Sequence, residues 1–284
     1  MNEQNLAYLR DQIKFTGFGE NLSERLLEKI EQQLDTFTLQ HQTKYGQNIM
    51  DVELYFSKSL TQDMYFFNAY VVNLKSAAGE MVQTFYINKG NNITLKEAYN
   101  LMSGRAVHKN FQNRDGENYS CWVQLDPFST TPNGNYKLAY YHENYGYNLE
   151  LTMSKYPILE LEFEEFKDSI MTSLRKGNLQ MVTFEIEGKD EIRFIEANPK
   201  FKSITIYDES MQKQFWQTET STVKNVAEET TVSQEKAETT NQAKEKLDVI
   251  RDEPKEQPPQ EKIQETSKKL PTQRKKRPRT IKKV

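Results

Sequence analysis

Two amphipathic helices are predicted at the start of the chain from the spacing of its apolar residues. Leucines and isoleucines recur there every three or four positions, which places them along one face of a helix. Residues 16–19, Thr-Gly-Phe-Gly, predict a helix end followed by a turn. The two apolar stripes consist of Leu6, Leu9 and Ile13, and of Leu22, Leu26, Leu27, Ile30 and Leu34.

From Phe37 onward the apolar period changes to two, which indicates strands with alternate side chains facing a core. Four β-branched and aromatic runs follow one another between polar or glycine-containing turns, and they predict four consecutive antiparallel strands. The runs cover residues 37–39, 52–56, 65–74 and 82–87. A third helix is then predicted from Thr94 as N-cap, with Glu97 completing a capping box, to Gly104.

The rest of the folded part carries two similar patterns. Residues 101–104 (Leu-Met-Ser-Gly) close one predicted helix, and residues 174–177 (Leu-Arg-Lys-Gly) close another. A glycine, Gly116 or Gly188, follows each at a similar distance, inside the first of two predicted hairpins. We therefore predict two repeat units that begin near Thr94 and Glu160. Their strands are expected at residues 105–111, 119–125 and 136–141, and at residues 179–187, 191–197 and 203–207.

The predicted fold class is α+β, with N-terminal helices, antiparallel sheets, two α-β-β-β repeat units and a disordered C-terminal tail. The runs of strands lack the long crossovers that a parallel sheet requires. The predicted domains are a helical hairpin plus antiparallel meander at 1–93, the two repeats at 94–216, and the disordered tail with a basic tip at 217–284. In the repeats, Leu101 and Leu174 are expected to occupy matching core positions at the ends of their helices.

Composition and charge separate the tail from the body. All 32 aromatic residues and all 11 glycines lie before position 217. A segment without aromatic or clustered apolar residues cannot offset the entropy cost of ordering its backbone, so we expect disorder there. Residues 1–216 carry 22 Lys and Arg against 29 Asp and Glu, whereas residues 267–284 carry 9 cations and no acid. Such block asymmetry is typical of an interaction tail.

The same sequence excludes several protein classes. One cysteine, Cys121, cannot build a disulfide framework and suits a reducing compartment. The first residues lack the basic and apolar regions of a signal peptide, and no window approaches the roughly 18 apolar residues of a membrane span. We expect a soluble protein in the cytoplasm.

Candidate chemical groups are sparse. The three histidines, His41, His108 and His142, lack the short spacing of zinc ligands, so we expect no metal and no cofactor. Cys121 is expected to be an inert buried thiol beside Trp122. Two pairs of alternate carboxylates, Asp51 with Glu53 and Glu185 with Glu187, fit the solvated face of a strand better than an acid–base pair. No phosphate loop or nucleophile motif is present.

Two segments suggest nucleic-acid binding. Residues 136–147 interleave five tyrosines with Lys137 and His142, a pattern that can stack unpaired bases or simply pack a sheet. The stronger signal is the basic tip, because cations there would displace counterions from a polyanion. It could alternatively be a solubilising tail, or a nuclear localisation signal in a eukaryote. The predicted nucleic-acid-binding residues are Lys268, Lys269, Arg274, Lys275, Lys276, Arg277, Arg279, Lys282 and Lys283.

Several stretches together resemble a known group of proteins. They are residues 14–20 (KFTGFGE), 63–68 (DMYFFN), 83–90 (QTFYINKG), 96–102 (KEAYNLM), 143–150 (ENYGYNLE) and 194–199 (FIEANP). Over residues 6–210 the chain resembles an uncharacterised family of Bacteroidetes proteins carried on conjugative or mobilisable elements. Its second half is similar to helix-and-strand repeats appended to topoisomerase-like proteins there. The resemblance implies a bacterial cytoplasm and a role near DNA transfer, which favours DNA or a DNA-bound partner for the tip.

We therefore expect a non-enzymatic accessory protein of a mobile element. Its folded body would bind an unidentified protein partner, and its tail would bind nucleic acid without sequence preference, because charges without aromatic or base-edge contacts give affinity but no readout. A pure protein-interaction module with a solubilising tail remains the alternative, and an enzyme with an unrecognised site stays open. No membrane partner is expected.

Overall fold

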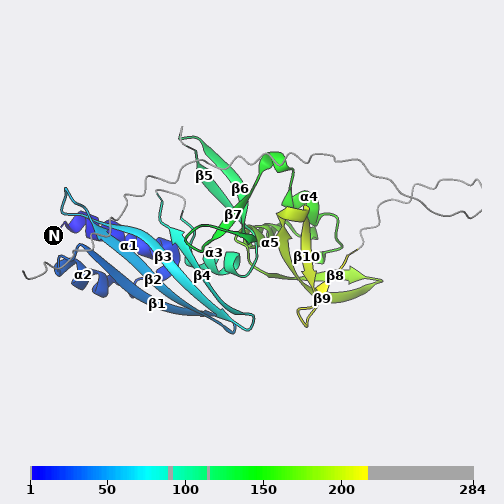
Figure 1. The fold of residues 1–284 in the computed structure, drawn as a ribbon. Helices are drawn as coiled ribbons and strands as arrows, with labels where there is room; N and C mark the ends of the chain where they lie inside the picture. Colours follow the sequence, from blue (N-terminus) through cyan, green and yellow to red (C-terminus); the bar gives the residue numbers. More distant parts are fainter. Residues whose placement is uncertain (1, 89–91, 114–115, 217–284) are drawn as a thin grey trace, which may run out of the picture. The chain divides into compact units, whose positions relative to one another are not determined.

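The structure is a computed structural model that describes residues 2–88, 92–113 and 116–216. Within these residues the fold is α+β, with N-terminal helices and three antiparallel sheets (Figure 1). This confirms the predicted fold class at that level. The predicted disorder of residues 217–284 falls outside the described residues.

The two predicted N-terminal helices are present as α1 (Glu3–Ile13) and α2 (Ser23–Glu31). The apolar stripe of each helix is buried, from Leu6 and Leu9 to Leu26 and Ile30. A π-helical turn (Lys14–Phe18) extends α1 and ends at Gly17, whose φ of 101° is a left-handed conformation that favours glycine. The glycine-containing segment therefore reverses the chain between the helices, as predicted.

The four predicted strands form one antiparallel meander in the order β1-β2-β3-β4 (Figure 1). Its alternate residues face a core that α1, α2 and α3 also enter, whereas the other face is largely polar. A bulge interrupts the pairing of β2 with β3, where Tyr55 pairs with Ala69 and Phe56 with Phe67. Asn68 is the extra residue. The strands are β1 (Thr36–Tyr45), β2 (Asn48–Lys58), β3 (Tyr65–Ser76) and β4 (Gly79–Tyr86).

The next helix and sheet follow the predicted order. Helix α3 (Leu95–Met102) has the capping box expected from Thr94 and Glu97. It precedes a three-stranded sheet of β5 (Val107–Gln112), β6 (Asn118–Thr130) and β7 (Tyr136–His142). Strand β6 continues well past the predicted end at residue 125, with a register shift against β7 between Asp126 and Thr130. Irregular pairing of this kind depends on the partner strand, which local sequence does not specify.

The middle sheet separates two hydrophobic cores. Cys121 and Val123 on one face of β6 belong to the core of the N-terminal sheet. Trp122, on the opposite face, belongs to a second core with Phe184 and Ile195 of the last sheet. Because successive side chains of a strand point to opposite faces, one short run of β6 serves both cores.

The last part contains elements that were predicted and elements that were not. Helix α5 (Glu164–Arg175) precedes the sheet β11-β10-β9-β8, as the pattern indicated. It starts later than expected, because residues 159–162 around Glu160 form a 3-10 turn. Helix α4 (Leu149–Met153) and strand β11 (Lys213–Gln214) were not anticipated. The other strands are β8 (Gln180–Ile186), β9 (Lys189–Asn198) and β10 (Ser203–Tyr207).

Candidate functional site

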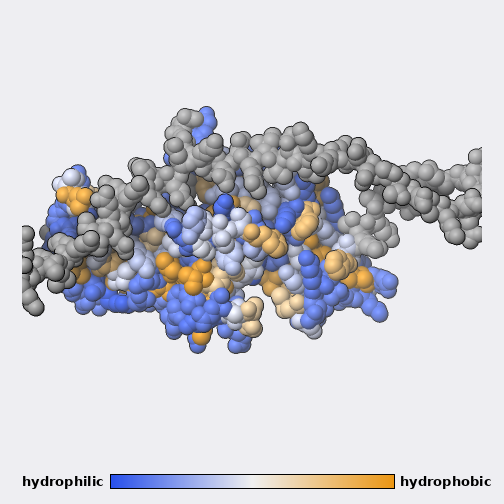
Figure 2. Space-filling view, in the orientation of Figure 1, coloured by the Kyte–Doolittle hydropathy of each residue, from blue (hydrophilic) through white to orange (hydrophobic). Residues whose placement is uncertain are grey.

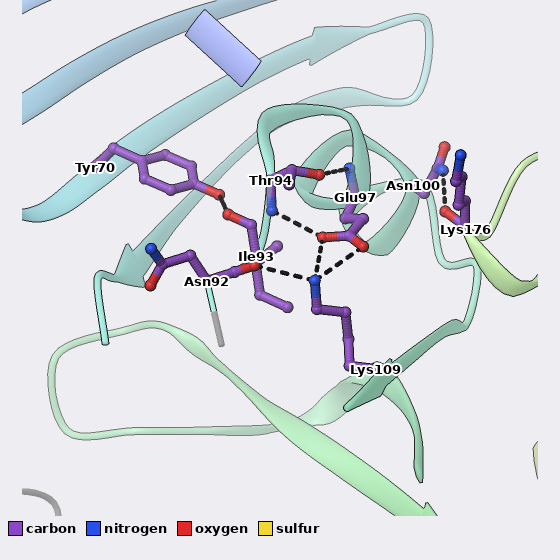
Figure 3. Close-up of polar contacts among 8 residues, drawn as sticks. All are labelled: Tyr70, Asn92, Ile93, Thr94, Glu97, Asn100, Lys109 and Lys176. Carbon is purple, nitrogen blue, oxygen red and sulfur yellow. Dashed lines mark hydrogen bonds and ion pairs between the residues drawn. The ribbon is translucent and has the colours of Figure 1, made fainter. Parts of the chain in front are cut away.

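A closed polar network surrounds the start of α3 (Figure 3). The backbone N–H of Thr94 donates to Glu97 at 2.8 Å, and the N–H of Glu97 donates to the Thr94 hydroxyl at 3.4 Å. The Lys109 ammonium lies 2.9 Å from the Glu97 carboxylate and also donates to the carbonyl of Asn92. The Lys109 and Glu97 side chains are only 16% and 12% exposed. Each charge is already paired, so this network ties the helix to β5 and offers no free group to a ligand.

Behind this network, Tyr70 is fully buried and donates its hydroxyl to the carbonyl of Ile93 at 2.6 Å (Figure 3). Burial raises the pKa of Tyr70 well above its usual value. The phenol therefore stays neutral and anchors β3 to the segment before α3.

A second buried junction joins the ends of α3 and α5. Asn100 is fully buried and donates to the carbonyl of Lys176 at 2.7 Å (Figure 3). Arg105 donates to the Asn100 side chain at 2.7 Å and to the carbonyl of Gly177 at 2.9 Å. Gly177 fits so closely that an added Cβ would lie 2.8 Å from the carbonyl oxygen of Ala106. The junction is structural, and nothing in the local sequence pattern pointed to Asn100 as its centre.

The structure places the three histidines apart, each against an aromatic ring. The ring centroids of His41 and Phe18 are 5.4 Å apart, and those of His108 and Trp122 are 5.2 Å apart. Burial lowers the pKa of His41 and of His108. His142 lies at the end of β7, 5.5 Å from the ring of Tyr119. Over residues 2–88, 92–113 and 116–216 no group of three or more His, Cys, Asp or Glu side chains could hold a metal ion.

The other chemical candidates have local structural partners or remain exposed. Cys121 is buried, which raises the pKa of its thiol to about 12 and makes it a poor nucleophile. Asp51 accepts hydrogen bonds from Gln42 and pairs with Lys75 at 2.9 Å; Gln42 and then Lys75 hold its pKa below the usual value. Glu53 accepts from Gln40 and Tyr55. Glu185 and Glu187 are simply exposed.

The tyrosine-rich segment at residues 136–147 is divided between surfaces. Tyr140 and His142 lie beside Phe111 and Tyr119 on one face of the middle sheet, with ring centroids 5.5–6.3 Å apart. Tyr147 instead contacts Trp122, and Tyr145 contacts Tyr141. The rings mostly pack against one another, so the segment does not form one stacking platform.

The nine residues predicted to bind nucleic acid lie outside the described residues. They are Lys268, Lys269, Arg274, Lys275, Lys276, Arg277, Arg279, Lys282 and Lys283. The prediction for the tip therefore stays a prediction.

A groove between α4 and α5 is the best-formed surface candidate. It encloses about 410 Å³ and is open to solvent. That volume lies within the usual range for pockets that bind small molecules or side chains. We call it the α4–α5 groove; it is lined by Asn148, Glu150, Leu151, Met153, Ser154, Leu161, Lys167 and Met171.

Large apolar side chains are exposed at and beside the α4–α5 groove. Leu151, in its wall, is 63% exposed. Phe163 and Phe166, on the turn that also supplies Leu161 and Lys167, are 59% and 57% exposed, and their rings meet edge to face at 5.9 Å. Figure 2 shows that elsewhere on the viewed face, too, hydrophobic residues form separate patches within a mostly hydrophilic surface. Clustered exposed aromatics beside a hollow are typical of a binding surface.

Sequence reasoning missed this groove. Leu151, Phe163 and Phe166 lie in segments whose apolar residues would ordinarily be assigned to a core. A signal was present in residues 160–168, where four acidic side chains alternate with Leu161, Phe163 and Phe166 before Lys167 and Asp168.

Comparison with protein-family models, with curated proteins and with solved structures found no match. None of the helices in the described residues has the length and apolar character needed to cross a membrane.

Proposed function

We propose that this chain is a non-enzymatic accessory protein of a mobile genetic element, with a body that binds a protein partner and a tail that binds nucleic acid. The observation that carries the proposal is the α4–α5 groove, where a hollow adjoins Leu151, Phe163 and Phe166. Exposed aromatic anchors next to a pocket supply most of the affinity in protein interfaces. The resemblance to proteins of conjugative elements supports the cellular setting, including the cytoplasm.

The polar groups of the body support binding over catalysis. In the described residues, Glu97, Lys109, Asn100 and Tyr70 are each engaged with protein partners. A catalytic group needs a perturbed side chain that faces a pocket. The groove contains one lysine, Lys167, and it is already paired with Glu150 at 2.6 Å.

Site-specific photo-crosslinking in the native host tests the protein-binding half. A photoreactive residue replaces Phe166 in one variant and Phe66, an exposed ring on the outer face of the first sheet, in a matched control. We expect a discrete protein adduct from position 166 alone. Equal adducts from both positions would show that the groove has no special role, and would favour another surface.

The nucleic-acid half is tested by titrating the full chain with duplex DNA at several salt concentrations. We expect weak binding, roughly 10⁻⁴–10⁻⁶ M at physiological salt, with a log–log salt slope of about −0.9 for each neutralised phosphate. Replacing Arg274, Lys275, Lys276, Arg277 and Arg279 by Gln should abolish it. Binding that survives these substitutions, or ignores salt, would leave the tail as a linker and favour the pure protein-interaction module.

We also propose that α3–β5–β6–β7 and α5–β8–β9–β10 are two copies of one α-β-β-β unit. Both helices end in the same hydrogen-bonded motif, in which Gly104 and Gly177 have φ values of 81° and 77°. Leu101 and Leu174 are fully buried one turn earlier, although in different cores. An experimental structure tests the proposal by superposition. A best fit that does not place Gly104 on Gly177 would contradict it.

A further inference from the structure

We infer that the α4–α5 groove binds a basic amphipathic helix of a protein partner, with apolar anchors on one face and Lys or Arg on the other. The inference rests on the proposed function and specifies the chemistry of the partner. Helices that dock in grooves present anchors at positions i, i+3 or i+4, and i+7.

The apolar part of the groove suits large flexible anchors. Met153 and Met171 are buried beneath it, and Leu161 is half-buried in its wall. Methionine side chains adapt their shape to different apolar partners. Leu151 on α4, with Phe163 and Phe166 beside the groove, would cover the anchors from water.

Charge selects a basic partner over an acidic one. Residues 149–174 contain six acidic side chains against two lysines. Lys167 is neutralised by Glu150 at 2.6 Å and Glu164 at 3.6 Å. By contrast, Glu162, Glu165 and Asp168 are exposed and have no ion-pair partner within the described residues. An acidic helix would meet like charges at this rim, whereas a basic helix would be attracted and oriented by them.

Fluorescence anisotropy with the full chain tests the inference. The probe is a labelled synthetic helix of about five turns with Leu at the anchor positions and Lys elsewhere, and its counterpart has Glu in place of every Lys. We expect the basic probe to bind and the acidic counterpart not to bind. Binding should weaken about tenfold in the double variant Leu151→Ser with Phe166→Ser, because each removes an exposed apolar anchor contact. The matched control, Phe66→Ser with Val82→Ser, changes two exposed apolar residues of the first sheet and should bind normally.

A second pair of variants isolates the charge. Glu162→Gln, Glu165→Gln and Asp168→Asn together should weaken binding several-fold at low salt, with a smaller effect at high salt. The control removes three exposed carboxylates of α2, at Glu24, Glu28 and Glu31, and should have little effect. Equal effects of the two triple variants would mean general attraction to an acidic body and would overturn the inference.

The remaining outcomes also decide the question. Groove-dependent binding of the acidic probe would overturn the basic chemistry but leave the proposed protein-binding function intact. Absence of binding by the basic probe would overturn the inference too, whereas photo-crosslinking from position 166 would still report separately on the proposed function.

Discussion

Replacing Gly177 by alanine should destabilise the protein far more than the same change at Gly104. Both glycines follow a helix, α5 or α3, and have nearly equal φ values of 77° and 81°. In each case the N–H of the next residue donates to a carbonyl five residues earlier, at 3.1 Å for Asn178 and 3.0 Å for Arg105. The two positions therefore share one conformational requirement.

The surroundings of the two glycines differ. A Cβ on Gly177 would lie 2.8 Å from the carbonyl oxygen of Ala106, 2.8 Å from a methyl of Val107 and 3.1 Å from the Cβ of Asn100. A Cβ on Gly104 would have no atom within 4 Å among the described residues. Both variants carry the cost of a left-handed alanine, about 1–2 kcal/mol. Only Gly177→Ala adds the overpacking cost of about 1–3 kcal/mol, because backbone atoms at the junction must move.

Urea denaturation of the full-length variants measures the difference through tryptophan fluorescence, since Trp122 is buried next to Ala106 in the second core. We expect the free energy of unfolding to fall by about 2–5 kcal/mol for Gly177→Ala and about 1–2 kcal/mol for Gly104→Ala. An excess of about 2 kcal/mol corresponds to a melting temperature lower by roughly 4–8 °C. Equal losses in the two variants would refute the close approach of α5 to the segment after α3.

Three further predictions concern buried polar groups. Lys109→Met leaves the Glu97 carboxylate, 12% exposed, without its cation and should cost about 2–4 kcal/mol in urea denaturation; Lys167→Met, whose partners are exposed, should cost less than about 1 kcal/mol. Similar costs would contradict the buried pairing. Cys121, with its pKa raised to about 12, should react with a thiol reagent at pH 8 only on unfolding, and rapid native-state labelling would show that it is accessible. Burial raises the pKa of Tyr70, Tyr147 and Tyr207, so above about pH 10 the native state retains more protons than the unfolded state, and stability should fall as pH rises further. Melting temperatures measured between pH 8 and pH 11 test this, and Tyr70→Phe should reduce the loss.

Local sequence alone determined most of the secondary structure. The change of apolar period at Phe37 separated helices from the strand meander, and it did so because the two elements repeat at different intervals. The box of Thr94 and Glu97 located the start of α3, since both hydrogen bonds of the motif join residues three apart. The glycines after α3 and α5 were equally readable, because a left-handed residue closes many helices.

Only the tertiary structure decided which surfaces meet. Cys121 and Trp122 read as one apolar run, yet they enter different cores because a sheet lies between two layers. The Asn100 junction joins residues more than 70 positions apart, and no local pattern encodes such a contact. Leu151, Phe163 and Phe166 have the composition of core residues, but their exposure depends on what covers them, and that is decided by packing of the whole chain rather than by local spacing.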